Sequence, residues 1–352
     1  MWAGFAAYLC VVWAAARLGR RVVWGLILFL VAAFAVAPVL LSHDVYSYVD
    51  YARLGVRHGL DPYVHPPLAA PGDPAYAEVT WTEATSAYGP LFTLTTYPLA
   101  WLPVGLAVAV LKAVAAFSVL GIAALTARIA AWRGIDPMRA AAFVALNPLV
   151  LVHVVGGAHN DALTMLLAML AVAAILSGRE RSAGAALAAA VATKLSATFL
   201  APFALVGTRF RGKLATGFLV TALVIAAAAY LAFGWDWLHG FGLAGENQSR
   251  TSHMSIPITI ARLTGLGAGG VRLAAALLFA ALVIYLLVWT ARGNDWIRAA
   301  AWTAFALLIA TAWLLPWYLI WPLPLVAISR DRTLQLLTLL LTAYQLGARI
   351  PL

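Results

Sequence analysis

The sequence predicts an all-α integral membrane protein, on the evidence of its composition, its long apolar runs and its charge pattern. Hydrophobic residues make up 64% of the 352 residues and charged residues only 10%, whereas a soluble domain carries about 25% charged residues. The apolar runs are long enough to cross a bilayer as helices, and short basic clusters separate them. We therefore expect a single polytopic domain over 1–352 with about 10 to 12 membrane segments.

The apolar runs define the expected segments in chain order. Nine are continuous: 2–17, 22–41, 104–130, 139–156, 159–177, 214–234, 271–291, 298–315 and 333–348. Two more are broken. Residues 182–207 lie between basic clusters and are interrupted at 193–196, so we expect two short helices that enter and return. Residues 316–329 are proline-broken, which is tolerated where a segment lines a cavity.

The basic clusters set the expected orientation, because Lys and Arg concentrate in cytoplasmic loops. The clusters are Arg17/Arg20/Arg21, Arg128/Arg133/Arg139, Arg179/Arg181, Arg209/Arg211/Lys213, Arg292/Arg298 and Arg330/Arg332. This orientation puts nine of the 13 acidic residues and all seven histidines on or near the opposite face. We expect a multi-pass cell-membrane protein with an exoplasmic site. The net charge of +10 belongs to loops, which leaves no basic surface for nucleic acid.

The largest external segment, 42–103, is rich in aromatics and prolines. The stretch DYARLGVRHGLDPY (50–63) predicts a short amphipathic helix followed by a turn at 59–62. We expect interfacial helices that lie along the membrane here. The single Cys10 excludes an internal disulfide and a cysteine metal cluster.

Asp44 is the first candidate site residue, in SHDVYSYVDY (42–51). The ordinary interpretation is a charge in water at the end of a span. On a helix, Tyr48 would share the face of Asp44, whereas Asp50 would lie about 120° away. We favour Asp44 as a general base and predict sugar or acceptor binding by His43, Tyr48 and Asp50.

A second candidate group is GGAHND (156–161). Its glycines allow a tight turn and Asp161 can cap the next helix, which is the plain structural interpretation. His159, Asn160 and Asp161 are also candidates to bind the sugar or acceptor. One histidine and one aspartate are too few for a metal site, so we expect neither a metal nor another cofactor.

Cations outside the basic clusters are candidates to bind a phosphate. Lys112 and Lys194 lie within predicted membrane segments, where ionisable residues are costly and mark functional sites. Pairing with an external acid, or snorkelling, is the structural alternative. Arg250 lies in a polar external loop, where an anionic lipid phosphate would be attracted. We predict that Lys112, Lys194 and Arg250 bind the phosphate of the donor substrate.

Two aromatic motifs complete the candidates, SAYGP (86–90) and LPWYLIWP (315–322). Aromatic belts are ordinary at membrane boundaries; the functional interpretation is stacking of Tyr88, Trp317 and Tyr318 on a sugar or a prenyl chain. The sequence lacks a P-loop, a GxGxxG and an Asp-x-Asp motif. An activated lipid is therefore the natural donor for an external enzyme.

Together, DVYSYVDYARLGVRHGLDPY, SAYGPLF, NPLVLVHVVGGAHNDAL, the break at Lys194 and LPWYLIWPLP resemble one family. It is the actinobacterial polyprenol-phosphate-mannose-dependent α-1,6-mannosyltransferases of lipomannan and lipoglycan synthesis, within the GT-C glycosyltransferase superfamily. The resemblance extends over about 40–325 in the same order. SAYGP departs from the more usual Ser-Pro-Tyr-Gly-Pro.

The resemblance implies a GT-C-type multi-span helical bundle and a glycosyltransferase activity. A sugar, mannose in this family, would pass from a polyprenyl-phosphate donor to a glycan or glycolipid acceptor by inverting single displacement. Asp44 matches the position of the family's external acidic residue and would take the acceptor proton. Lys194 and Arg250 would stabilise the departing phosphate. Most members use no metal.

Two other classes fit part of the pattern. A secondary transporter or flippase of an envelope precursor would also have broken helices and buried charges, but its binding groups usually lie near mid-membrane. A non-catalytic scaffold for envelope synthesis is the third interpretation. Within the enzyme class, arabinose and glucose are the alternative sugars.

Overall fold

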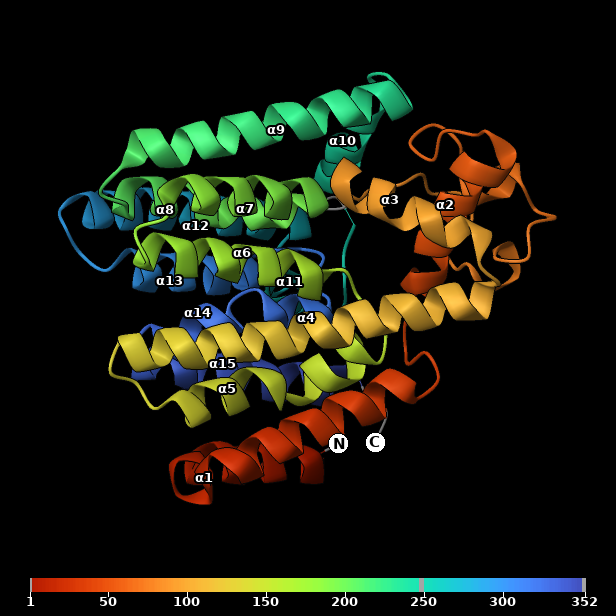
Figure 1. Cartoon of the computed structure of the whole chain (residues 1–352). Helices are drawn as coiled ribbons and strands as arrows, with labels where there is room; N and C mark the ends of the chain where they lie inside the picture. The colour runs from red at the N-terminus through yellow and green to blue at the C-terminus, as the bar shows by residue number, and fades with distance from the viewer. Residues whose placement is uncertain (1, 247–249, 350–352) are drawn as a thin grey trace.

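Long apolar runs fold as helices in a membrane because each backbone N–H and C=O must find its partner within the segment. A computed structural model describes residues 2–246 and 250–349, and these contain helices and no strand, as predicted (Figure 1). Four of the helices in these ranges are long and apolar enough to cross a bilayer: α1 (Trp2–Val36), α4 (Val104–Trp132), α9 (Arg211–Phe233) and α12 (Ala268–Ala291).

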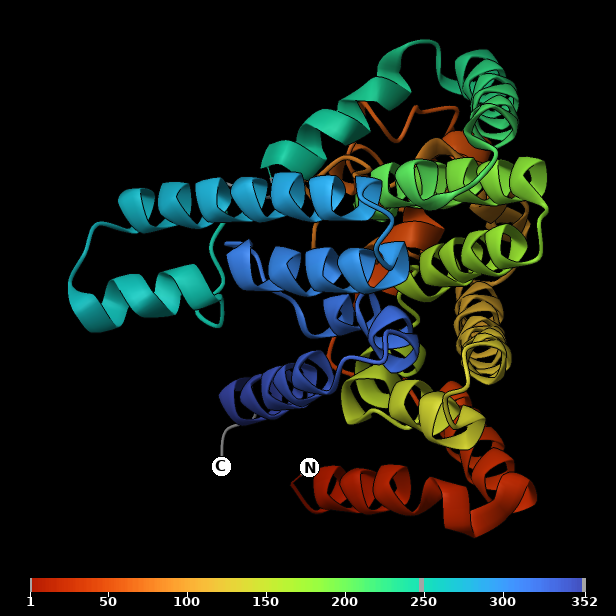
Figure 2. The same cartoon turned by 90° about the vertical axis from the view of Figure 1, so that its left-hand side faces the viewer.

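Shorter helices complete the body. They are α2 (Asp44–His58), α3 (Pro90–Thr96), α5 (Pro137–Ala145), α6 (Asp161–Leu176), α7 (Glu180–Thr193), α8 (Ala201–Gly207), α10 (His239–Glu246), α11 (Ile256–Thr264), α13 (Trp296–Ala310), α14 (Leu323–Ile328) and α15 (Arg332–Arg349). In Figure 2, α11 and the first part of α12 extend beyond the other helices. The main core is built from small and branched apolar side chains of α1, α4–α7 and α13–α15.

The first two predicted spans are joined without a loop. α1 runs through both of them, but Gly19 breaks it with φ 75° and ψ 158°. Only glycine adopts such a positive φ readily. Figure 2 shows α1 sharply bent.

The predicted span 139–156 is wrong as a single helix. α5 ends at Ala145, and a π-helical turn, Val150–Val155, follows. Pro148 explains the break, because it disfavours helical backbone at Asn147 before it. The Asn147 side chain accepts a hydrogen bond from the Leu149 amide at 3.0 Å, which satisfies a donor that the break leaves open.

The broken pair predicted within 182–207 is confirmed. α7 ends at Thr193, Lys194 has extended backbone (φ −156°, ψ 128°), and a 3₁₀ turn, Leu195–Leu200, leads into α8. The SAYGP loop lies directly on this break, since the Gly89 amide donates to the Thr193 carbonyl at 3.1 Å. A Cβ atom at Gly89 would lie 2.0 Å from the Ala192 carbonyl oxygen, so the close approach requires glycine.

Basic turns meet at one end of the body. Arg133, after α4, donates to the Ile328 carbonyl and pairs with Asp295. Arg298 pairs with Asp331 at 2.8 Å. The α4–α5, α12–α13 and α14–α15 connections are therefore held together at one end, while α2 and α3 lie at the opposite end (Figure 1).

The 42–103 segment is held by a buried ion pair. α2 begins at Asp44, earlier than expected, and ends at His58, and the next residue, Gly59, has left-handed backbone (φ 66°, ψ 23°). Arg53 Nε lies 2.7 Å from Asp73 Oδ1, and His58 Nε2 lies 2.8 Å from Asp73 Oδ2. Burial alone would raise the pKa of Asp73, but the hydrogen bonds from Arg53, the Ala75 amide and His58 leave it below its usual value. These contacts fix α2, and with it the position of Asp44.

Candidate active site

A cavity of about 330 Å³ lies where five parts of the chain meet. They are the start of α2, the loop 81–88, the break at 194–196, the region around α10 and the following loop (Leu243 and Arg250), and the segment 307–321. Six of the predicted residues line it: Asp44, Tyr88, Lys194, Arg250, Trp317 and Tyr318. Residues more than 250 positions apart in the chain therefore share one cavity.

Asp44 is the acidic side chain of this cavity. Its Oδ1 accepts a hydrogen bond from Trp81 Nε1 at 3.2 Å, and its Oδ2 lies 3.7 Å from Nδ1 of His159. The side chain is 16% exposed. Burial raises the pKa of Asp44, while the Trp81 hydrogen bond and the charge of Lys194 oppose the rise. A carboxylate with a raised pKa is better suited to accept a proton.

Ser47 and Tyr51 share the cavity face of α2 with Asp44, as expected for residues three and seven positions further along a helix. Tyr48 does not. It packs between Tyr88 and Phe92, with ring centroids 4.8 and 5.0 Å away.

Lys194 belongs to a buried charged cluster. Its ammonium lies 2.8 and 2.7 Å from the two carboxylate oxygens of Asp161, and Trp321 Nε1 donates to the same carboxylate at 2.7 Å. Asp161 is fully buried, whereas the Lys194 side chain is 18% exposed and lines the cavity. The ion pair expected as the structural alternative is therefore present. It also holds the ammonium at the cavity wall.

Arg250 reaches the cavity from the polar loop before α11. Its guanidinium carbon lies 5.0 Å from the centre of the Trp81 ring, a cation–π distance. Trp81 therefore contacts both Asp44 and Arg250. Trp81 and Trp313 were not predicted, because no motif distinguishes them from other membrane-boundary aromatics. Trp321 lies in the LPWYLIWP motif, from which only Trp317 and Tyr318 were predicted.

His159 and Asn160 lie next to this cluster and do not line the cavity. The His159 ring stacks on Trp317 with centroids 3.8 Å apart and planes 16° apart. Asn160 Oδ1 lies 3.5 Å from the Lys194 ammonium. The GGAHND turn thus supports the residues that line the cavity.

Three other predicted residues are also outside the lining. Lys112 donates to the carbonyls of Ala37 and Pro38. His43 is half exposed, and its Nδ1 lies 3.1 Å from the Glu78 carbonyl oxygen. Asp50 is buried at 1% exposure, and neither of its carboxylate oxygens has a hydrogen-bond partner.

The environment of Asp50 changes its protonation. Burial and the charge of Asp73 raise the pKa of Asp50 to about 7, against the opposing charges of His58 and Arg53. In the described ranges, no three His, Cys, Asp or Glu side chains come together as a ligand set for a metal ion.

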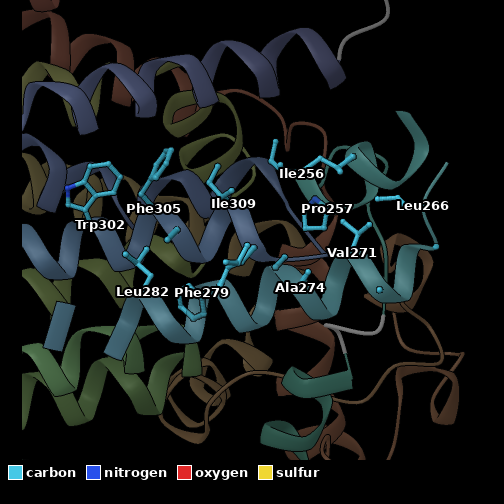
Figure 3. Close-up of a pocket in the computed structure, with 17 residues that line it drawn as sticks. Ile256, Pro257, Leu266, Val271, Ala274, Phe279, Leu282, Trp302, Phe305 and Ile309 are labelled. Atoms are coloured by element: carbon cyan, nitrogen blue, oxygen red, sulfur yellow. The ribbon is translucent and has the colours of Figure 1, made fainter. Parts of the chain in front are cut away.

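A second hollow, of about 750 Å³, is an apolar groove between α11, α12 and α13 (Figure 3). Pro257, Val271, Phe279 and Phe305 are among its lining side chains, and none of the lining residues is charged. The groove ends beside the cavity, because Ala310 lines the groove and the next residue, Thr311, lines the cavity.

The chain between Arg250 and α11 runs from the cavity to the mouth of the groove. It is held there by Ser252, whose amide donates to the Ala312 carbonyl and whose hydroxyl donates to the Leu314 carbonyl, both at 2.9 Å. The polar cavity and the apolar groove are therefore neighbours on either side of the end of α13.

Comparison with known proteins adds independent information. A family model described as "Alpha-(1->6)-mannopyranosyltransferase, N-terminal domain" matches residues 1–211. Over an alignment of 354 positions, the chain is 30% identical to alpha-(1->6)-mannopyranosyltransferase A of Mycobacterium tuberculosis. The alignment covers 88% of this chain and 67% of that protein. Over an alignment of 258 positions, it is 29% identical to the protein of the same name from Corynebacterium glutamicum. This alignment covers 64% of this chain and 51% of that protein.

Proposed function

Since the chain belongs to the alpha-(1->6)-mannopyranosyltransferase family, we propose that it transfers mannose from a polyprenyl-phosphate donor to a hydroxyl of a glycan or glycolipid acceptor. The family membership favours this enzyme activity over the transporter and scaffold alternatives. The observation that carries the proposal is the composition of the cavity. One carboxylate, Asp44, and two cations, Lys194 and Arg250, share it with stacked aromatic side chains.

We further propose an inverting single displacement. Asp44 takes the proton of the acceptor hydroxyl as the acceptor oxygen bonds to the anomeric carbon of the sugar. The bond from that carbon to the phosphate oxygen breaks, and its electron pair stays on the phosphate. A positioned base of this kind contributes about 10²–10⁴-fold.

The arrangement of the acids supports single displacement. A retaining double displacement needs a second carboxylate about 5 Å from the first to act as nucleophile. Asp161 is the neighbouring acid, but both its oxygens are bonded to Lys194. Among the described lining residues, only Asp44 offers a carboxylate to the cavity.

We propose that Lys194 and Arg250 stabilise the departing phosphate. Preorganised cations at the site of developing charge contribute about 10²–10³-fold each. Asp161 balances the charge of Lys194 before the donor binds, which keeps the ammonium in one position. Lys112 is left out of this group, since its ammonium is bonded to backbone carbonyls elsewhere.

The apolar groove supports a lipid-borne donor. It begins beside the cavity at Ala310, so a phosphate at Lys194 and Arg250 could be followed by a hydrocarbon chain along α12 and α13. The basic turns lie at the end of the body opposite the cavity. Because Arg and Lys mark cytoplasmic turns, this placement supports an exoplasmic site. We propose that Tyr88, Trp317 and Tyr318 contact the sugar or the first prenyl units.

The test is transfer by the purified protein in detergent, with polyprenyl-phosphate mannose, glucose and arabinose offered separately beside a mannosylated glycolipid acceptor. We expect mannose to be consumed. Asp44→Asn should lower transfer by about 10²–10⁴-fold. The size-exclusion elution profile of the protein in detergent should be unchanged. Asp236→Asn removes an exposed acid away from the cavity and serves as the matched control. Full transfer by Asp44→Asn would refute the assignment of the base.

A further inference from the structure

His159 is a buried polar group for which the proposed transfer step has no role. Its side chain is 0% exposed, and neither ring nitrogen has a hydrogen-bond partner. Buried side chains without partners are rare and costly, so each calls for an explanation. The chain keeps the ring in place despite this cost. Trp317 stacks against it, and a Cβ atom at Gly157 would come within 3.0 Å of His159 Cδ2.

The Asp44 carboxylate is the partner within reach. His159 Nδ1 lies 3.7 Å from Asp44 Oδ2, about 0.7 Å longer than a hydrogen bond. Asp44 Oδ1 already accepts from Trp81, so a bond to Oδ2 would give each carboxylate oxygen one donor. Catalytic hydrogen bonds are often long without substrate and shorten when it binds.

Burial, assisted by nearby charges, favours the neutral form of the His159 ring. Burial holds the pKa of His159 well below its usual value, and the nearby charges of Lys194 and His153 act in the same direction. Asp44 is the acid within ion-pair distance of the ring. A neutral imidazole carries one N–H and one acceptor nitrogen, and the bond that forms decides which nitrogen holds the proton.

We propose that His159 is a positioning residue for Asp44. Its Nδ1–H donates to Asp44 Oδ2, weakly across the 3.7 Å of the free protein and at full hydrogen-bond distance when substrate fills the cavity. The catalytic consequence rests on the proposed function. With Trp81 on the other oxygen, the carboxylate is held in one orientation toward the acceptor hydroxyl. The acceptor proton passes to Asp44 alone, while His159 keeps its own proton throughout.

Three substitutions separate the N–H from the ring. His159→Phe keeps a ring to stack on Trp317 but has no donor. His159→Asn carries an amide NH₂ close to the position of Nδ1, and His159→Gln carries one closer to Nε2. His239→Phe makes the same change at an exposed histidine and is the control. We expect His159→Phe to lower kcat by roughly 10- to 100-fold, the effect of one hydrogen bond to a charged group, with KM changed less than threefold.

The pH dependence distinguishes positioning from a structural role. An N–H donor favours the charged carboxylate, so its loss raises the pKa of Asp44. The acid limb of kcat, which reports the substrate-bound enzyme, should move up by about one pH unit in His159→Phe. It should return in His159→Asn and not in His159→Gln. Unchanged kcat and limb in His159→Phe, or equal rescue by both amides, would overturn the proposal.

A second measurement needs no turnover. Dicyclohexylcarbodiimide reacts with protonated carboxyl groups, so mass spectrometry of Asp44 labelling against pH follows its protonation. The pH midpoint of Asp44 labelling should rise in His159→Phe relative to wild type and to His239→Phe; an unmoved midpoint would overturn the proposal.

If the wild type transfers no sugar from any polyprenyl phosphate, the proposed function fails, and the labelling still decides whether His159 acts on Asp44. If His159→Phe does not fold, the comparison of His159→Asn with His159→Gln decides.

Discussion

The ion pair between Lys194 and Asp161 has two separable roles, one in stability and one in transfer. Replacing Lys194 by methionine leaves a fully buried carboxylate with Trp321 as its remaining side-chain donor. Breaking a buried pair by removing one partner costs about 3–5 kcal/mol, because the other charge stays buried and uncompensated. We therefore expect Lys194→Met to lower the free energy of unfolding by about that amount.

The double variant Lys194→Met/Asp161→Asn removes both charges, and replacing a buried pair by neutral groups is often close to neutral. It should recover most of the lost stability, measured by thermal unfolding in detergent from the tryptophan fluorescence. Transfer should stay about 10²–10³-fold below wild type in both variants, because the phosphate has lost its cation.

The two readouts test the reasoning separately. A double variant that regains both stability and transfer would show that Lys194 acts only by neutralising Asp161. A Lys194→Met variant as stable as wild type would show that the pair is not buried as described. Lys213→Met, in a basic turn at the other end of the body, is the matched control for removing one lysine.

Three further predictions follow from the site and its surroundings. Burial raises the pKa of Asp44, and the base acts when deprotonated. We therefore expect kcat/KM to fall on the acid side with a midpoint above the ordinary aspartate pKa. A kcat/KM independent of pH down to about 4 would contradict this. Because the pKa of Asp50 is raised to about 7, the folded state binds more protons than the unfolded one between about pH 4 and 7. The unfolding temperature should therefore fall as pH rises through this range. Asp50→Asn should reduce this dependence of the unfolding temperature on pH. Ala306 lines the groove, so Ala306→Trp should fill it, raise KM severalfold for a long-chain polyprenyl donor and leave KM for a short-chain analogue unchanged. Equal effects on both donors would show that the polyprenyl chain does not lie there.

Much of the architecture follows from composition and local pattern. A bilayer requires every backbone polar group to be paired within the chain, so the long apolar runs predict helices and their approximate bounds. The break at Lys194 could be predicted because a lysine within an apolar run is costly unless a special local structure accommodates it. The interruption before Val150 could also have been predicted from Pro148, since proline disfavours helix at the residue before it.

The grouping of the site residues was predictable only in part. Asp44, Lys194, Arg250 and Trp317 are selected by their chemistry within otherwise apolar sequence, and the structure brings them to one cavity. Lys112 satisfies the same criterion, yet its ammonium is bonded to carbonyls outside the cavity lining. An intramembrane charge signals a costly position, but the sequence does not state which partner offsets the cost.

The sequence by itself determined the helical membrane class, the partition of basic turns and polar residues to opposite ends, and the chemical types present in the site. Only the tertiary structure decided the pairing of Lys194 with Asp161, the contact of Trp81 with Asp44, and the apolar groove beside the cavity. The reason is physical. Helix formation depends on neighbours within a turn or two, whereas these contacts join residues 33 and 37 positions apart or span three helices, and they exist only once the helices have packed.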